Sequence, residues 1–149
     1  MDRLKKQILA ERENVETALN HLKYAMERKD KTVIELAAIG TFLHNVYNGI
    51  ENILKQIVTS RNKEIPDSAT WHKELLNLSV SMEIISEGLS DELYKYLTFR
   101  HFFVHAYGFM LEEIHLEDLA ANIPKVWFQF VSEIESFLKK GANGKGQKK

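Results

Sequence analysis

Branched apolar residues alternate at spacings of three and four over positions 36–57, and this pattern constrains the fold of the chain most strongly. Residues three and four apart share one face of an α-helix, so the run predicts a long helix with a continuous buried stripe. A capping box over residues 32–35 predicts where this helix begins. An isolated coiled coil would need a longer repeat, so we interpret the stripe as the core of a bundle. The stripe consists of Leu36, Ile39, Leu43, Val46, Ile50, Ile53 and Ile57.

The flanking segments also have helical spacing. Apolar residues recur on one face over residues 3–28, which predicts a helix before the long one. A loop around Pro66 follows the long helix, and the next helix should run from Trp71 to near Gly88. Gly40 and Gly49 inside the long helix each cost about 1 kcal/mol relative to alanine. We expect close approach of neighbouring helices to be the reason for both glycines.

The C-terminal half predicts two further helices. Ser90 has the form of an N-cap for the first, and Gly108 is a natural terminator for it. The last helix should cover residues 116–140, with a kink or restart at Pro124. Residues 141–149 are rich in glycine and lysine, which predicts a flexible tail after a single domain over residues 1–140. No strand pattern competes, so we predict an all-α, antiparallel bundle of about five helices.

Composition excludes several classes of protein. The chain has 149 residues and no cysteine, so it has the length of one domain and can form neither a disulfide framework nor a thiolate metal site. Its net charge of -1 gives no overall basic field for nucleic acid, so a local patch would have to bind RNA. No apolar run is long enough to span a bilayer, and no signal peptide is evident. We therefore expect a cytoplasmic protein that does not bind membranes.

Residues 100–107 carry the most chemistry. Arg100, His101, His105 and Tyr107 interrupt an apolar helical pattern. Arginine is a permanent cation that suits phosphate, and histidine exchanges protons near neutral pH. RNA supplies its own nucleophile, the 2′-hydroxyl. His105 could remove its proton as a general base while Arg100 stabilises the phosphorane. This chemistry needs no metal and no cofactor.

The spacing of these residues points to a dimer. On one straight helix, Arg100 and Tyr107 lie about 20° apart, but Arg100 and His105 lie about 140° apart. A second copy of the helix, related by a two-fold axis, could bring one subunit's Arg100 near the other subunit's His105. We therefore predict a homodimer with a composite site.

Other interpretations of the polar residues stay open. Arg100 and His105 could be a surface arginine and a buried histidine without chemistry. His101 and His105 have the spacing of a zinc pair, but a third ligand is missing. Glu51 and His44 are either core-edge groups or supporting partners of the site. For His72, beside Trp71, we expect a contact at the start of a helix.

The motif resembles a known signature. Arg100, four intervening residues and His105 resemble the motif of HEPN ribonucleases, and the extension to Tyr107 is similar to the form found in HepT toxins. The stretches Tyr47-Asn48-Gly49-Ile50-Glu51-Asn52-Ile53 and Trp71-His72-Lys73-Glu74-Leu75-Leu76 strengthen the likeness. The resemblance to HepT-like ribonucleases spans roughly residues 5–138.

The resemblance implies a specific function. HepT proteins are helical dimers that cleave RNA, with tRNA as a target class, as toxins of toxin–antitoxin pairs. Their antitoxin, a minimal nucleotidyltransferase of the MntA kind, transfers AMP from ATP to the motif tyrosine, here Tyr107. Arg100 and His105 would be catalytic, with His101 and Glu51 supporting. Relatives often carry a second arginine where this chain has Val104, which implies weaker RNA binding here.

Two other functions remain as alternatives. A non-catalytic HEPN adaptor would bind a nucleotidyltransferase and present its substrate, although it would not need both Arg100 and His105. A plain helical dimerisation module would explain the apolar stripe but not the cluster that ends at Tyr107.

Overall fold

The computed structural model describes the backbone of residues 2–105 and 116–147, and the side chains of residues 3–103 and 116–141. All regular structure in these ranges is helical, as the sequence predicted. The helices are α1 (Asp2–Met26), α2 (Val33–Ser60), α3 (Trp71–Ser81), α4 (Glu87–His105) and α5 (Leu116–Gln147).

Helix α2 is the centre of the bundle, and its predicted stripe is buried along its whole length. The stripe residues are at most 9% exposed. The capping box is present: Glu35 accepts a hydrogen bond from the backbone N–H of Thr32, and Thr32 Oγ1 accepts one from Ile34 N–H. Every other helix packs against α2. The bundle therefore forms because apolar side chains of α2 pack against neighbouring helices on several sides.

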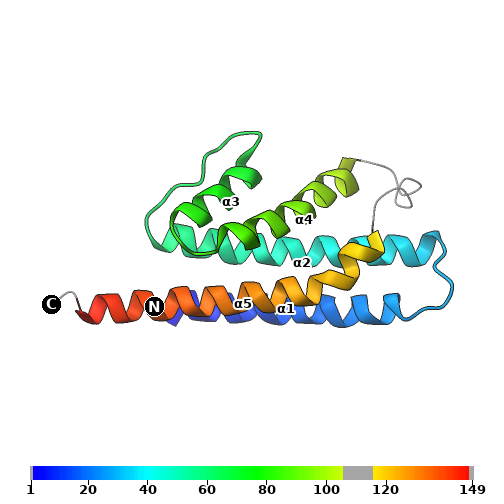
Figure 1. Cartoon of the computed structure of the whole chain (residues 1–149), viewed down its shortest axis with the longest axis horizontal. Coiled ribbons are helices and arrows are strands. Elements are labelled where there is room, and N and C mark those ends of the chain that lie inside the picture. Colours follow the sequence, from blue (N-terminus) through cyan, green and yellow to red (C-terminus); the bar gives the residue numbers. More distant parts are fainter. Residues whose placement is uncertain (1, 106–115, 148–149) are drawn as a thin grey trace.

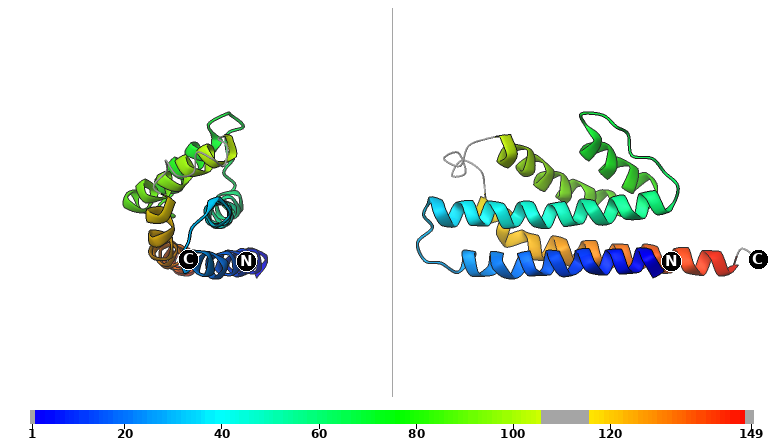
Figure 2. Two further views of the ribbon diagram at one scale, coloured as in Figure 1. Left: turned by 90° about the vertical axis from the view of Figure 1, so that its right-hand side faces the viewer. Right: turned by 180° about the vertical axis from the view of Figure 1, so that it is seen from behind.

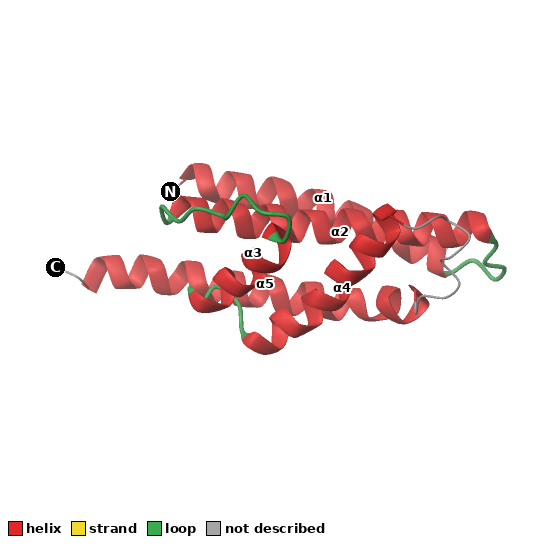
Figure 3. Cartoon of the chain, turned by 90° about the horizontal axis from the view of Figure 1, so that it is seen from above, coloured by secondary structure: helices red, strands yellow, loops and turns green. Residues whose placement is uncertain are grey.

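The neighbours of α2 divide into two groups. Helices α1 and α5 lie side by side along one side of α2, and α3 and α4 lie across the opposite side (Figures 1 and 2). The connected helices α1 and α2 run in opposite directions (Figure 1). Seen from above, α3 and α4 are short and inclined to the three long helices (Figure 3). This arrangement lets one face of α2 meet the start of α3 and the last turns of α4.

Both glycines inside α2 mark close contacts between helices, as predicted. A Cβ on Gly49 would lie 2.2 Å from Val15 Cγ2 of α1. A Cβ on Gly40 would lie 2.7 Å from Phe103 Cε1 of α4. A side chain at either position would therefore push a neighbouring helix away from α2.

The predicted boundary between α3 and α4 was wrong. Helix α3 ends at Ser81, and Glu83 has a positive φ of 62° in the turn that closes it. Buried Ile84 and Ile85 continue the helical spacing of apolar residues through this turn, so periodicity concealed the break. Gly88 does not end a helix, because it lies near the start of α4.

The N-cap of α4 is also displaced from its predicted position. Ser86 Oγ accepts a hydrogen bond of 3.1 Å from Leu89 N–H, so Ser86 caps α4 and Ser90 lies within the helix. Glu133 of α5 in turn accepts hydrogen bonds from the N–H and hydroxyl of Ser86. The cap thus also connects α4 to α5, a contact that the sequence could not reveal.

Helix α5 continues through Pro124, with its first turns inclined to the rest, which agrees with the predicted kink (Figure 1). It extends to Gln147, into the segment 141–149 that composition assigned to a flexible tail. The boundary at residue 140 between a folded domain and a flexible tail stays a prediction. Within the described residues, no helix combines the length and apolarity needed to cross a membrane.

Candidate functional site

Four polar side chains interrupt the apolar surface of α2 on the side that meets α3 and α4. They follow one another at helical spacing: His44, Tyr47, Asn48 and Glu51. Tyr47 and Glu51 are buried, and His44 and Asn48 are half-buried. Their spacing of three and four places them on one face over two turns of helix.

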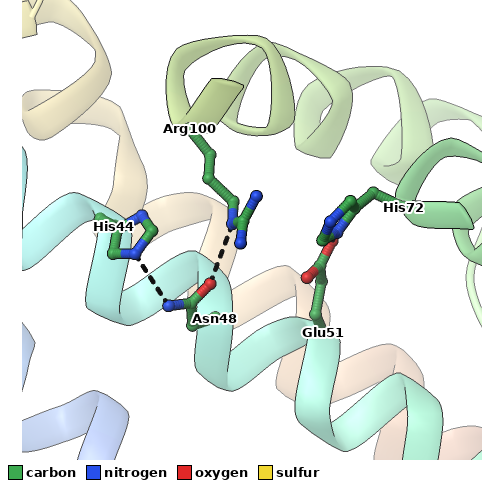
Figure 4. Close-up of polar contacts among 5 residues, drawn as sticks. All are labelled: His44, Asn48, Glu51, His72 and Arg100. Carbon is green, nitrogen blue, oxygen red and sulfur yellow. Dashed lines mark hydrogen bonds and ion pairs between the residues drawn. The ribbon is translucent and has the colours of Figure 1, made fainter. Parts of the chain in front are cut away.

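Arg100 of α4 reaches this polar face. Its Nε donates a hydrogen bond of 3.2 Å to Asn48 Oδ1 (Figure 4). The side chain is half-buried, and within the described residues no carboxylate forms an ion pair with it. A half-buried guanidinium that is held by a neutral amide keeps its charge and its terminal donors for another ligand.

The same amide fixes the state of His44. Asn48 Nδ2 and His44 Nε2 are 3.0 Å apart. Because Oδ1 of Asn48 accepts from Arg100, Nδ2 is its donor and His44 Nε2 must accept, which requires a neutral imidazole protonated on Nδ1. Burial and then the positive charge of Arg100 lower the pKa of His44 from its ordinary value, in agreement with this assignment. Nδ1 of His44 is buried without a hydrogen-bond partner in the described part of the chain.

A second pair lies one turn further along α2. Glu51 Oε2 accepts a hydrogen bond of 2.7 Å from Nδ1 of His72, the second residue of α3 (Figure 4). The His72 ring also stacks on Trp71, with ring centroids 3.7 Å apart. Lys55 Nζ lies over the Trp71 ring at 4.9 Å. These contacts fix the start of α3 against α2 and hold the imidazole in one orientation.

Tyr47 lies between His44 and Glu51 along the same face of α2. Its side chain is fully buried, and its hydroxyl interacts with the carboxylate of Glu51. Burial, and then the negative charge of Glu51, raise the pKa of Tyr47 well above its ordinary value, while the charge of Arg100 acts in the opposite direction. Tyr47 is therefore a neutral phenol that contributes a buried polar atom to the site.

The structure locates part of the predicted catalytic motif. Arg100 joins the cluster on α2, and His101 is on the exposed side of α4. His105 is the last residue of α4, but its side chain lies outside the described residues. Tyr107 also lies outside them, as does the predicted terminator Gly108. The proposed roles of His105 and Tyr107, and the composite dimeric site, stay predictions.

Three members of the cluster, Tyr47, Asn48 and His72, were missed from the sequence. Asn48 was not selected, although it shares a face with Glu51 and His44 at helical spacing, which was the available signal. His72 was expected to make only a contact at the start of its helix. It does lie there and stacks on Trp71, but its main polar partner is Glu51, and no sequence pattern indicates a pairing between separate helices.

Within the described residues there is no group of three potential metal-ligating side chains. The cluster consists of a cation beside two imidazoles, one neutral and one held by a buried carboxylate. Such a cluster can bind a phosphate group and exchange protons with it.

Comparison with known proteins gives a family and a fold. A family model described as HepT-like protein matches residues 38–141, which include the α2 cluster and the motif from Arg100 onward. A solved structure of a cytosolic protein of unknown function, YutE from Bacillus subtilis, is similar with a TM-score of 0.62 and 18% sequence identity. The match covers 87% of this chain and 92% of the YutE chain, and at this identity it supports the helical fold alone. A comparison with curated proteins gives no match.

Proposed function

The chain belongs to the HepT-like protein family, and from this premise we propose that it is a metal-independent endoribonuclease that acts as the toxin of a toxin–antitoxin pair. One observation carries the proposal: Arg100 is anchored by Asn48, without a carboxylate partner in the described chain, beside two imidazoles. This arrangement leaves the terminal nitrogens of Arg100 as donors that a phosphate can use.

The chemistry follows from the substrate. In RNA the 2′-oxygen attacks the adjacent phosphorus, and the bond from phosphorus to the 5′-oxygen breaks. In our proposal His105 accepts the proton of the 2′-hydroxyl, and Arg100 stabilises the negative charge that develops on the phosphorane oxygens. The products are a 2′,3′-cyclic phosphate and a 5′-hydroxyl. We propose tRNA as the substrate class because the family resemblance implies it.

Asn48 would serve this chemistry by orienting the arginine. Its hydrogen bond to Nε directs the guanidinium toward the polar face of α2 (Figure 4). Nε is then occupied, and the terminal nitrogens are the donors that a phosphate can use in a bidentate manner. Neutral His44 beside it adds no second positive charge that would repel the guanidinium.

We further propose that the protein is a homodimer and that a nucleotidyltransferase antitoxin controls it by attaching AMP to Tyr107. The added phosphate would be attracted to Arg100, which lies two turns earlier on the sequence pattern, and would occupy the place of the RNA phosphate. The support for this part is the family and the motif, because Tyr107 lies outside the described residues.

The direct test is the chemistry of the products. Purified protein is incubated with tRNA in the presence of a metal chelator, and the ends of the fragments are identified. The proposal predicts cleavage that the chelator does not abolish, with 2′,3′-cyclic phosphate and 5′-hydroxyl ends. Loss of all activity on chelation, or fragments with 5′-phosphate ends, would contradict it. Uncut tRNA, together with tight binding of the protein to a nucleotidyltransferase, would instead support the alternative of a non-catalytic adaptor.

A further inference from the structure

We propose that His72 is a proton-transfer residue of the site, with Nε2 donating a proton to the 5′-oxygen that leaves when RNA is cut. This inference rests on the proposed ribonuclease function and assigns it a second acid–base residue. The reaction needs a base for the 2′-hydroxyl and an acid for the leaving oxygen. His105 fills the first role in the proposal, and the second role has no other assigned residue.

The orientation of the His72 ring is fixed by two contacts. Nδ1 donates to Glu51 Oε2 at 2.7 Å, and one face of the ring stacks on Trp71. An imidazole held at one nitrogen and one face cannot rotate to exchange its two nitrogens. A carboxylate at Nδ1 is the arrangement that sets the tautomer of acid–base histidines, because it leaves Nε2 as the nitrogen that gains and loses the proton.

Glu51 and His72 differ in their exposure to solvent. The side chain of Glu51 is 5% exposed, whereas that of His72 is 20% exposed. The carboxylate is therefore inaccessible to a polyanion such as RNA, and the imidazole covers it. A ligand that approaches this face of α2 meets a proton donor and not a negative charge.

His72 lies close to the position that a phosphate bound to Arg100 would take. Glu51 lies one turn beyond Asn48 on α2, and Asn48 holds Arg100. Figure 4 shows the guanidinium between the His44–Asn48 pair and the Glu51–His72 pair, with its terminal nitrogens on the side of His72. A phosphate bound to those nitrogens would present its oxygens toward the imidazole.

The step balances without a further reactant. The bond from phosphorus to the 5′-oxygen breaks, its electron pair remains on that oxygen, and the proton on Nε2 of the imidazolium joins it. His72 is left neutral, with Nδ1–H still donating to Glu51, and Nε2 takes a new proton from water before the next cycle.

A structural role is the competing explanation, because Glu51 and His72 also join α2 to α3. The test must therefore separate proton donation from anchoring. An RNA oligonucleotide with a mapped cleavage site is prepared in two forms, one with the ordinary 5′-oxygen and one with sulfur in its place. A thiolate leaves without a proton, because thiols ionise near pH 8.5, far below alcohols.

The variant is His72→Gln, whose amide can still donate to Glu51 but cannot transfer a proton. His21→Gln is the matched control, since His21 is exposed on α1 and its ring is tilted against that of Phe42, away from the cluster. We expect His72→Gln to cut the oxygen substrate on the order of 10²-fold more slowly than wild type. The sulfur substrate should be cut at nearly the wild-type rate, and the control should match wild type on both.

The remaining outcomes overturn the inference in distinct ways. Equal slowing of His72→Gln on both substrates would leave His72 as a positioning residue only, and no slowing would remove it from the reaction. A wild-type protein that cuts neither substrate would refute the proposed function and this inference with it. Should His72→Gln fail to fold, His72→Asn takes its place on the same two substrates, because its amide can also donate to Glu51 and cannot transfer a proton.

Discussion

His44 is the residue whose ionisation depends most directly on Arg100. Burial and the arginine's charge both lower its pKa. We predict that Arg100→Gln raises the pKa of His44 part of the way toward 6.5, because burial, the larger cause, remains. An NMR titration of the His44 ring measures this change. An unchanged pKa would show that the charge of Arg100 does not affect the ionisation of His44.

The same shift has a consequence for stability. The unfolded chain binds a proton at His44 near pH 6.5, whereas the folded chain binds it only at lower pH. The free energy of unfolding should therefore fall as the pH drops from 6.5 through the lower pKa of the folded state. The free energy of unfolding should depend less on pH in Arg100→Gln than in wild type. Chemical denaturation at several pH values tests that difference.

Glycines within helices allow a matched comparison. We predict that Gly49→Ala destabilises the protein by about 1–3 kcal/mol, because a Cβ there would lie 2.2 Å from Val15 Cγ2 and must displace α1. A Cβ on Gly88 meets nothing within 4 Å. Gly88→Ala should therefore stabilise the protein by up to about 1 kcal/mol through helix propensity alone. Urea denaturation measures both, and equal effects of the same sign would contradict the packing argument.

The N-cap of α4 can be tested by comparing substitutions at two serines. Ser86→Ala should cost about 1 kcal/mol, because Leu89 N–H loses its acceptor and Glu133 loses its hydroxyl partner. Ser90→Ala should change the free energy of unfolding by less than about 0.5 kcal/mol. Thermal or urea denaturation of the two variants compares them. A larger loss of stability for Ser90→Ala than for Ser86→Ala would instead support Ser90 as the N-cap, as the sequence indicated.

Sequence patterns predicted the helices correctly where interactions within one helix determine its structure. The capping box at Thr32 and the apolar stripe of α2 specified that helix, because both signals lie within one element. The turn at Glu83 was missed because apolar residues continue through it. The motif arginine was found, but the pairing of Glu51 with His72 was not, because contacts between separate helices depend on how the bundle packs.

In the proposed function, a nucleotidyltransferase partner acts on Tyr107. We predict that Tyr107→Phe remains an active ribonuclease and resists neutralisation by a nucleotidyltransferase with ATP, because it lacks the acceptor oxygen. Intact-mass measurement should show an added AMP on wild type and none on Tyr107→Phe. An adduct that persists on Tyr107→Phe would place the control point elsewhere.

In the proposed function Arg100 stabilises a phosphate during RNA cleavage, and a comparison of two arginines tests this role. The cleavage rate of tRNA is measured, with chelator present, for wild type, Arg100→Ala and Arg61→Ala. Arg61 is the C-cap residue of α2, about three turns beyond Glu51, and lies over the Phe137 ring at 4.9 Å, which makes it a control for the loss of a half-buried cation. We predict a loss of about 10²-fold or more for Arg100→Ala and little change for Arg61→Ala. Equal rates for wild type and a folded Arg100→Ala would contradict the claim.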